Sequence, residues 1–156
     1  CQPGGPPIII GGGGKRVLTA AAQQADIVGL NASLHAGSVG PETALSALGE
    51  RFLERRNWVE EAAGDRFAQI ELQMNTFMTA VTSSTSEAEE MFDGMAPMFG
   101  LTAEQAKTIP MVLAGTVNDV CEQLERYRDQ YGTSYWVIHD GEIETMAPVV
   151  AKLAGS

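Results

Sequence analysis

The feature of this sequence best suited to chemistry is a run of four glycines, Gly11–Gly14, which follows the apolar run Ile8–Ile10 and precedes Lys15 and Arg16. Successive residues without side chains let backbone N–H groups approach an anion, and the N-terminus of the following helix adds positive potential. Two cations at a helix start oppose the usual preference for acids there, which makes sense if an anionic group binds nearby. The pattern therefore favours a phosphate site, with a simple tight turn as the alternative.

Two known phosphate motifs do not fit this run. The dinucleotide motif G-x-G-x-x-G, started at Gly11, would need a glycine where Arg16 stands. A P-loop would need a glycine in place of Ile9 and a serine or threonine in place of Arg16. The next predicted strand ends in Leu30-Asn31, where a Rossmann fold has an acidic residue.

Strand and helix patterns alternate along the chain. Short apolar runs predict four buried strands, around Ile9, Val28, Leu72 and Val137. The third of these alternates with period two from Phe67 and can extend as far as Val81. Apolar residues at helical spacing predict helices over 15–25, 41–63, 87–96 and 117–131, and a last one from near Thr145 with Pro148 in its first turn. The pairs Thr102 with Gln105 and Thr116 with Asp119 have the spacing of helix N-terminal caps.

This alternation predicts an α/β fold with a parallel sheet and right-handed crossovers. A complete (β/α)8 barrel needs about 250 residues, so these 156 residues supply about half of one. An open flavodoxin-like sheet, which needs only about four or five strands, is the competing architecture. Residues 1–7, rich in proline and glycine and without an initiator methionine, are interpreted as a linker, and residues 8–156 as one half-barrel domain.

Several motifs, in order along nearly the whole chain, resemble one known family. They are Pro6-Pro7-Ile8-Ile9-Ile10-Gly11-Gly12-Gly13-Gly14-Lys15-Arg16-Val17-Leu18, Ala25-Asp26-Ile27-Val28-Gly29, Phe99-Gly100-Leu101-Thr102, Leu113-Ala114-Gly115-Thr116, Cys121-Glu122-Gln123-Leu124 and Tyr131-Gly132-Thr133-Ser134-Tyr135. Together with the tail from Ala147 to Gly155, they resemble the C-terminal half of the luciferase-like monooxygenase superfamily, in particular its actinobacterial branch that uses coenzyme F420. The combination is specific, whereas no single motif is.

The resemblance implies the C-terminal half of a (β/α)8 barrel and a cofactor, coenzyme F420 or alternatively FMN. It implies hydride transfer between reduced F420 and an organic small molecule, with an FMN-dependent monooxygenase or a non-catalytic ligand-binding or assembly half-barrel as alternatives. The residues it places at the cofactor are Gly12, Gly13, Gly14, Lys15 and Arg16, near the phosphate, and Gly29, Leu30 and Asn31 as a second contact region. Most acid–base candidates of the family lie in the N-terminal half, so no catalytic residue is assigned.

Other polar residues have weaker claims to a site. His35 and His139 follow predicted strands on the side where barrel active sites lie, but an ordinary loop or turn histidine is the simpler interpretation of each. Gln69, Glu71 and Gln73 share one side of a strand, and we expect that side to face outward; a barrel interior, where polar layers suit a cofactor, is the alternative. The two histidines are far apart and lack an acid or cysteine at ligand spacing, so no metal site is predicted.

Composition narrows the classes of partner. The net charge of -10 and the absence of a basic patch argue against nucleic acid. Neither a signal peptide nor a membrane-spanning run is apparent, so we expect a cytoplasmic protein. Cys121 is expected to be a buried apolar residue, and the methionines, Met98 among them, to fill the core. Because the outer strands of half a barrel lack partners, we expect homo-oligomers or pairing with an N-terminal half.

Overall fold

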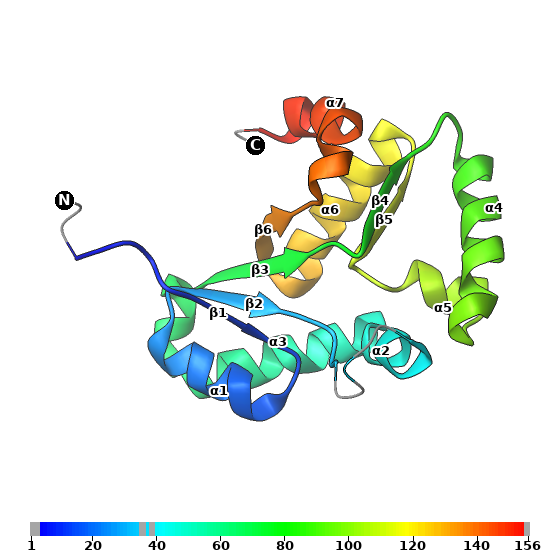
Figure 1. The fold of residues 1–156 in the computed structure, drawn as a ribbon. Coiled ribbons are helices and arrows are strands. Elements are labelled where there is room, and N and C mark those ends of the chain that lie inside the picture. Colours follow the sequence, from blue (N-terminus) through cyan, green and yellow to red (C-terminus); the bar gives the residue numbers. More distant parts are fainter. Residues whose placement is uncertain (1–3, 35–36, 38–39, 155–156) are drawn as a thin grey trace.

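The computed structural model describes residues 4–34, 37 and 40–154. Its main sheet has four parallel strands, which are β1 (Ile9–Gly12), β2 (Ile27–Leu30), β3 (Glu71–Asn75) and β6 (Thr133–Val137), in that order (Figure 1). A separate parallel pair joins β4 (Met78–Val81) to β5 (Val112–Gly115). The strand order follows the chain, without the reversal that marks the binding crevice of a doubly wound sheet. The predicted parallel α/β half-barrel is therefore confirmed over the flavodoxin-like alternative.

Helices connect the strands in the way a parallel sheet requires. Figure 1 shows α1 and α3 together along one side of β1 and β2, and α4 with α5 on the outer side of the β4–β5 pair. The α-helices are α1 (Lys15–Gln24), α2 (Pro41–Ser46), α3 (Gly49–Ala63), α4 (Thr85–Met95), α5 (Ala103–Lys107), α6 (Val117–Tyr131) and α7 (Ile143–Leu153). Short 3-10 helices are η1 (Gly64–Gln69), η2 (Ala96–Phe99) and η3 (Asp140–Glu142).

The two faces of the main sheet have different surroundings. Val28, Leu72 and Met74 are fully or nearly fully buried in the core, and Trp136 on β6 packs against Tyr127 of α6 with ring centroids 6.0 Å apart. Side chains on a strand alternate between faces, so the odd-numbered positions of β1 to β3 lie on the opposite face. On that face the register aligns Gly11, Gly29 and Gln73, and the outer positions Ile9 and Val137 are exposed. In a complete (β/α)8 barrel, whose helices form the outer ring, the sheet face away from the helices is the interior one.

The predicted helix over 41–63 is wrong in one respect, because it is two helices. α2 ends at Ser46, α3 begins at Gly49, and Leu48 between them has an extended backbone. The hydroxyl of Ser46 donates to the carbonyl of Thr43 and accepts the N–H of Ser33, which ties the end of α2 to the loop after β2. A Cβ at Gly49 would lie 2.7 Å from the Thr108 carbonyl, so a close contact with another segment also fixes the break.

The strand predicted from Phe67 to Val81 is also divided. Residues 64–69 form η1, and the strand begins only at Glu71. After Asn75 the chain changes partner, since the N–H of Thr76 donates to Val137 of β6 and that of Phe77 to Met111 beside β5. The alternation of polar and apolar residues, from which this strand is predicted, does not indicate which strand each segment pairs with. The last helix likewise begins at Ile143, two residues before the predicted start, so Pro148 lies inside it.

Candidate functional site

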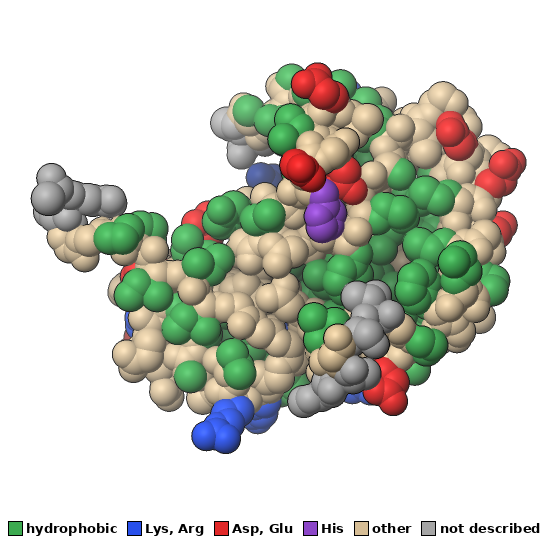
Figure 2. Space-filling view, viewed as in Figure 1, with side chains coloured by type: hydrophobic (Ala, Val, Ile, Leu, Met, Phe, Trp, Pro, Cys, Tyr) green, Lys and Arg blue, Asp and Glu red, His purple; other side chains and the backbone are tan. Residues whose placement is uncertain are grey.

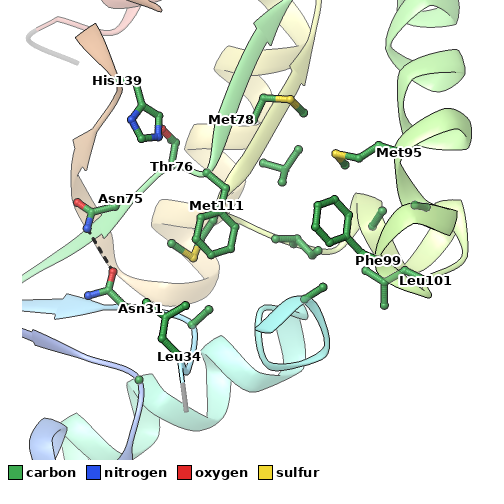
Figure 3. A pocket seen from close by; sticks show the side chains of 18 of the residues that line it. Asn31, Leu34, Asn75, Thr76, Met78, Met95, Phe99, Leu101, Met111 and His139 are labelled. Atoms are coloured by element: carbon green, nitrogen blue, oxygen red, sulfur yellow. Dashed lines mark hydrogen bonds between the residues drawn. The ribbon is translucent and has the colours of Figure 1, made fainter. Parts of the chain in front are cut away.

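A pocket of about 840 Å³ opens at the carboxyl ends of β1, β2 and β3. Barrel enzymes place their active sites at this end of their strands. Three of the residues predicted to contact a cofactor line the pocket, namely Gly12, Gly13 and Asn31, and His139 also lines it. Figure 3 shows Asn31 and Asn75 reaching toward each other at one side of the pocket, with Met95, Phe99 and Leu101 at the other. His35 lies outside the described residues.

The glycine run is shaped by close contacts. A Cβ at Gly13 would lie 2.7 Å from the carbonyl oxygen of Ala32, and one at Gly12 would lie 2.7 Å from the side chain of Val17. Gly14 differs, since no described atom lies within 4 Å of its hypothetical Cβ. The N-cap residue of α1 is Gly14, and no side-chain hydrogen bond caps this helix N-terminus among the described residues. The first N–H groups of α1 therefore have neither helical partners nor a cap.

Arg55 of α3 supports this turn from beneath, and the sequence did not single it out. Its side chain is only 4% exposed, its Nε donates to the carbonyl of Gly13 at 3.0 Å, and an NH1 hydrogen bond of 2.7 Å reaches the carbonyl of Ser46. Burial lowers the pKa of Arg55, which the neighbouring Glu54 carboxylate opposes, yet a guanidinium stays charged in proteins. A trans peptide places its N–H opposite its C=O, so the Gly14 N–H points away from Arg55. The turn thus has a buried positive charge behind it.

The two cations at the start of α1 lie apart from the pocket walls. The ammonium of Lys15 lies 3.9 Å from the carboxylate of Glu61 and 5.9 Å from the ring centre of Trp58, both on α3. Lys15, Arg16 and Gly14 are absent from the residues described as lining the pocket. Their role at a cofactor stays a prediction.

The second predicted contact region contributes through Asn31. Gln73 Nε2 donates to Asn75 Oδ1 at 2.7 Å, and Asn75 Nδ2 donates to Asn31 Oδ1 at 3.3 Å, which forms a line of three amides across β3 and β2. A Cβ at Gly29 would lie 2.8 Å from Gln73 Oε1, so the glycine makes room for this line. Gln73 is 3% exposed, and the expectation that its side of the strand faces outward is wrong for this residue. Leu30 is fully buried in the core.

His139 is held at the pocket by Glu142. One Glu142 oxygen accepts the backbone N–H of His139 at 3.1 Å, and the other accepts that of Thr79 at 2.7 Å. Partial burial opposes ionisation of Glu142, yet the N–H donors of Thr79 and His139 hold its pKa below its ordinary value. This carboxylate fastens β4 to the loop after β6. Among the described lining residues, His139 is the only one with an acidic, basic or thiol side chain.

The far side of the pocket is apolar. Its walls come from β4, from the residues before β5, and from the end of α4 with η2, and they include Met78, Met95, Phe99, Ile109 and Met111. Figure 2 shows apolar side chains gathered in the hollow beside His139. Cys121 is a free, buried thiol, as predicted, whereas Met98 is 77% exposed and not part of the core. No helix of the described residues is long and apolar enough to cross a membrane.

Comparison with solved structures identifies the class of fold. The long-chain alkane monooxygenase LadA matches with a TM-score of 0.60 and 14% identity, over 95% of this chain and 41% of its own. The F420-dependent tetrahydromethanopterin reductase of Methanopyrus kandleri matches with 0.57 and 15%, over 94% and 49%. Riboflavin lyase RcaE, solved with modified FMN and riboflavin, matches with 0.58 and 10%, over 94% and 43%.

These neighbours belong to the luciferase-like monooxygenases that the sequence resembles, and the likeness shows that the chain has the fold of their half-barrel. The chain spans less than half the length of each of the three. No protein-family model and no curated protein matches the sequence.

Proposed function

We propose that this chain is the cofactor-binding half of an F420-dependent oxidoreductase, which transfers hydride between the reduced deazaflavin and an organic substrate. An FMN-dependent monooxygenase is the second candidate. The Methanopyrus kandleri neighbour uses F420 and riboflavin lyase was solved with modified FMN, so both cofactors occur on this fold. When bound, either cofactor supplies the hydride or electron chemistry, and the chain supplies binding and orientation.

The observation that carries the proposal is the uncapped glycine turn at the pocket rim. Gly12 and Gly13 line the pocket, the N-terminus of α1 lacks a cap among the described residues, and Arg55 places a positive charge behind Gly13. Free N–H groups, a helix N-terminus and a buried cation together suit a phosphate group. The residues therefore fit the phosphate that FMN and F420 share, and the ring would lie toward Asn31 and the amide line.

The experiment is a fluorescence titration with phosphorylated and unphosphorylated ligand pairs. FMN is compared with riboflavin, and F420 with its deazaflavin fragment that lacks the phosphate. We expect saturable binding in which the phosphate strengthens affinity by about tenfold or more, corresponding to about 1.4 kcal/mol. The tighter of the two phosphorylated ligands identifies the cofactor. Failure of a folded chain to bind either one contradicts the proposal.

Two variants separate ligand contacts from folding. Gly14→Ala adds a methyl group where no described atom lies within 4 Å, so we expect the free energy of unfolding to stay within about 1 kcal/mol and phosphate-dependent affinity to fall. Lys15→Ala together with Arg16→Ala removes the two cations, and we expect this double substitution to weaken the binding of FMN but not that of riboflavin. Equal weakening of both ligands would show that the cations do not act on the phosphate.

We also propose that the open sheet edges pair with another chain, a second copy or a separate N-terminal half of a barrel. The support is that Ile8 and Ile9 at β1 are 56% and 51% exposed, and that Tyr135 and Val137 at β6 are also exposed. Edge strands with exposed apolar residues favour such pairing. Sedimentation at micromolar concentration is expected to show a dimer or larger species. A monomer at all concentrations would exclude self-association.

A further inference from the structure

The pocket has two ends that come from different parts of the fold. Its polar end is formed at the main sheet by Gly12, Gly13, Asn31 and Asn75. Its other end is formed by Met78, Met95, Phe99, Ile109 and Met111, which all lie between β3 and β6 in sequence; we call these five residues the apolar lobe. The chain therefore leaves the main sheet after β3 and builds one wall of the pocket before it returns at β6.

The chemistry of the apolar lobe restricts what it can hold. Among the described residues lining the whole pocket there is no Asp, Glu, Lys or Arg. Moving a charged group into such surroundings without a partner is strongly unfavourable, whereas burial of each CH₂ group of a hydrocarbon is favourable. Three of the five lobe residues are methionines, whose unbranched, polarisable side chains adapt to ligands of different shape. In Figure 3, Met78, Met95, Phe99 and Met111 surround the hollow.

We propose that the apolar lobe binds the uncharged hydrocarbon body of the substrate, an aliphatic chain or aryl group, next to the cofactor. The volume of about 840 Å³ exceeds what a flavin-sized ring system needs and leaves room for a second molecule. The polar end, with its amides and glycine turn, suits the ring and phosphate of the cofactor. The lobe, which offers no charged partner among the described residues, selects neutral substrates over carboxylates or amines. This inference rests on the proposed function for the role of its ligand as substrate.

The experiment measures ligand binding to the apolar lobe in the absence of any cofactor. Nile red, a neutral fluorescent dye, is titrated into the chain and then displaced by 1-decanol or by decanoate, both kept below the concentrations at which they aggregate. The two competitors share one hydrocarbon chain and differ in the charge of the headgroup. We expect saturable Nile red binding and at least about tenfold stronger displacement by decanol than by decanoate, because the carboxylate must lose its hydration in an apolar lobe.

Two methionines three positions apart provide a matched pair of variants. Met95 lines the lobe, while Met98 is 77% exposed and lies outside it. Met95→Lys is expected to weaken the binding of Nile red and of decanol by at least about tenfold, and to reduce the difference in affinity between decanol and decanoate. Met98→Lys is expected to leave the affinities and this difference unchanged. Met95→Gln, which adds polarity without charge, is expected to lie between them and shows whether charge or packing is responsible. Circular dichroism confirms that each variant is folded.

The outcomes separate this inference from the cofactor proposal. Cofactor binding with no Nile red binding, or with equal displacement by decanol and decanoate, overturns the apolar lobe as a substrate site. Equal loss in the Met95→Lys and Met98→Lys variants also overturns it, because the dye would then bind elsewhere. Nile red binding with the expected charge selectivity, but without FMN or F420 binding, keeps the lobe and rejects the cofactor assignment.

Discussion

Two junctions in this chain join a parallel strand to a helix through small residues, yet they treat the helix N-terminus differently. Between β5 and α6, Asp119 Oδ2 accepts the backbone N–H and the hydroxyl of Thr116, both at 2.9 Å, and the Thr116 hydroxyl accepts the N–H of Asp119. Between β1 and α1, the N-cap residue is Gly14, and no side-chain hydrogen bond caps the N-terminus of α1 among the described residues. The chain places its own carboxylate at one helix N-terminus and leaves the other without a side-chain cap among the described residues, where we propose that the phosphate binds.

The two junctions also differ in what holds the strand end. A Cβ at Gly115, where φ is 144°, would lie 2.5 Å from the Asp119 Cβ, so the cap itself packs against the turn. At the β1 junction the support comes from 42 residues further along the chain, through the Arg55 hydrogen bond to the Gly13 carbonyl. The β5–α6 turn is thus closed by its own residues, whereas the β1–α1 turn is supported on one side by a residue of the distant helix α3.

Of the substitutions that test this comparison of the two junctions, Arg55→Met is expected to have the largest effect on stability. It leaves the Gly13 and Ser46 carbonyls without their buried donor, and hydrogen bonds to charged groups contribute about 1.5–3 kcal/mol each. Because removal of a buried charge recovers part of this, we expect the free energy of unfolding in urea to fall by about 2–3 kcal/mol. We also expect the affinity advantage of FMN over riboflavin to shrink, since the positive charge behind the turn is gone.

Arg56→Met is the matched control. Arg56 is the next residue of α3, but its guanidinium pairs with Glu60 at the surface at 2.5 Å and contacts the ring of Phe67. Surface pairs four residues apart on a helix contribute about 0.3–0.5 kcal/mol. A loss of stability equal to that of Arg55→Met, or an unchanged FMN preference in Arg55→Met, would show that Arg55 has no special role at the turn.

Arg55 also shows where sequence reasoning missed a residue it could have found. It stands in a charged run with Arg51, Arg56 and several glutamates, which favours a solvated helix face. Yet it lies three residues after Phe52 and four before Val59, the two fully buried apolar residues of α3, and so belongs to the buried stripe of that helix. A charge within an apolar stripe is a signal for a buried, hydrogen-bonded group. Its partners, two carbonyls, could not be predicted, because backbone acceptors leave no trace in sequence.

Features set by local chemistry were predictable, and features set by contacts between distant segments were not. The capping boxes of α5 and α6 follow from Thr102 with Gln105 and from Thr116 with Asp119, and the structure confirms both. The sequence indicates that the glycine run lets backbone N–H groups approach an anion, with a tight turn as the alternative. None of its four glycines has a positive φ, and Gly13 is instead required by the nearby Ala32 carbonyl. That contact, like the change of strand partner after Asn75, involves segments that only the fold brings together.

At the capped β5–α6 junction, loss of the Asp119 charge is expected to lower the free energy of unfolding by less than Arg55→Met does, and the loss is expected to depend on pH. Hydrogen bonds from the backbone and side chain of Thr116 lower the pKa of Asp119 below its ordinary value of 3.8. A carboxylate with a lowered pKa in the folded state stabilises the fold above that ordinary value and loses this contribution as the pH falls through the folded pKa. We therefore expect Asp119→Asn to be less stable than the natural chain at pH 7, and the difference between them to decrease below about pH 4.

The measurement is urea unfolding of the natural chain and of Asp119→Asn between pH 7 and pH 3, with Asp129→Asn, an exposed position on the same helix, as the control. The difference between two chains cancels the titration of all other carboxylates, so a pH-dependent gap reports the cap itself. Thr116→Ala should lose about 1 kcal/mol at pH 7, the usual contribution of a helix cap. A gap that does not change with pH would mean that Asp119 is not held as a charged cap. The Thr116 hydroxyl, which accepts the backbone N–H of Asp119 at 3.3 Å, would then cap α6 without help from a charge, and the loss of stability in Thr116→Ala would measure the whole cap.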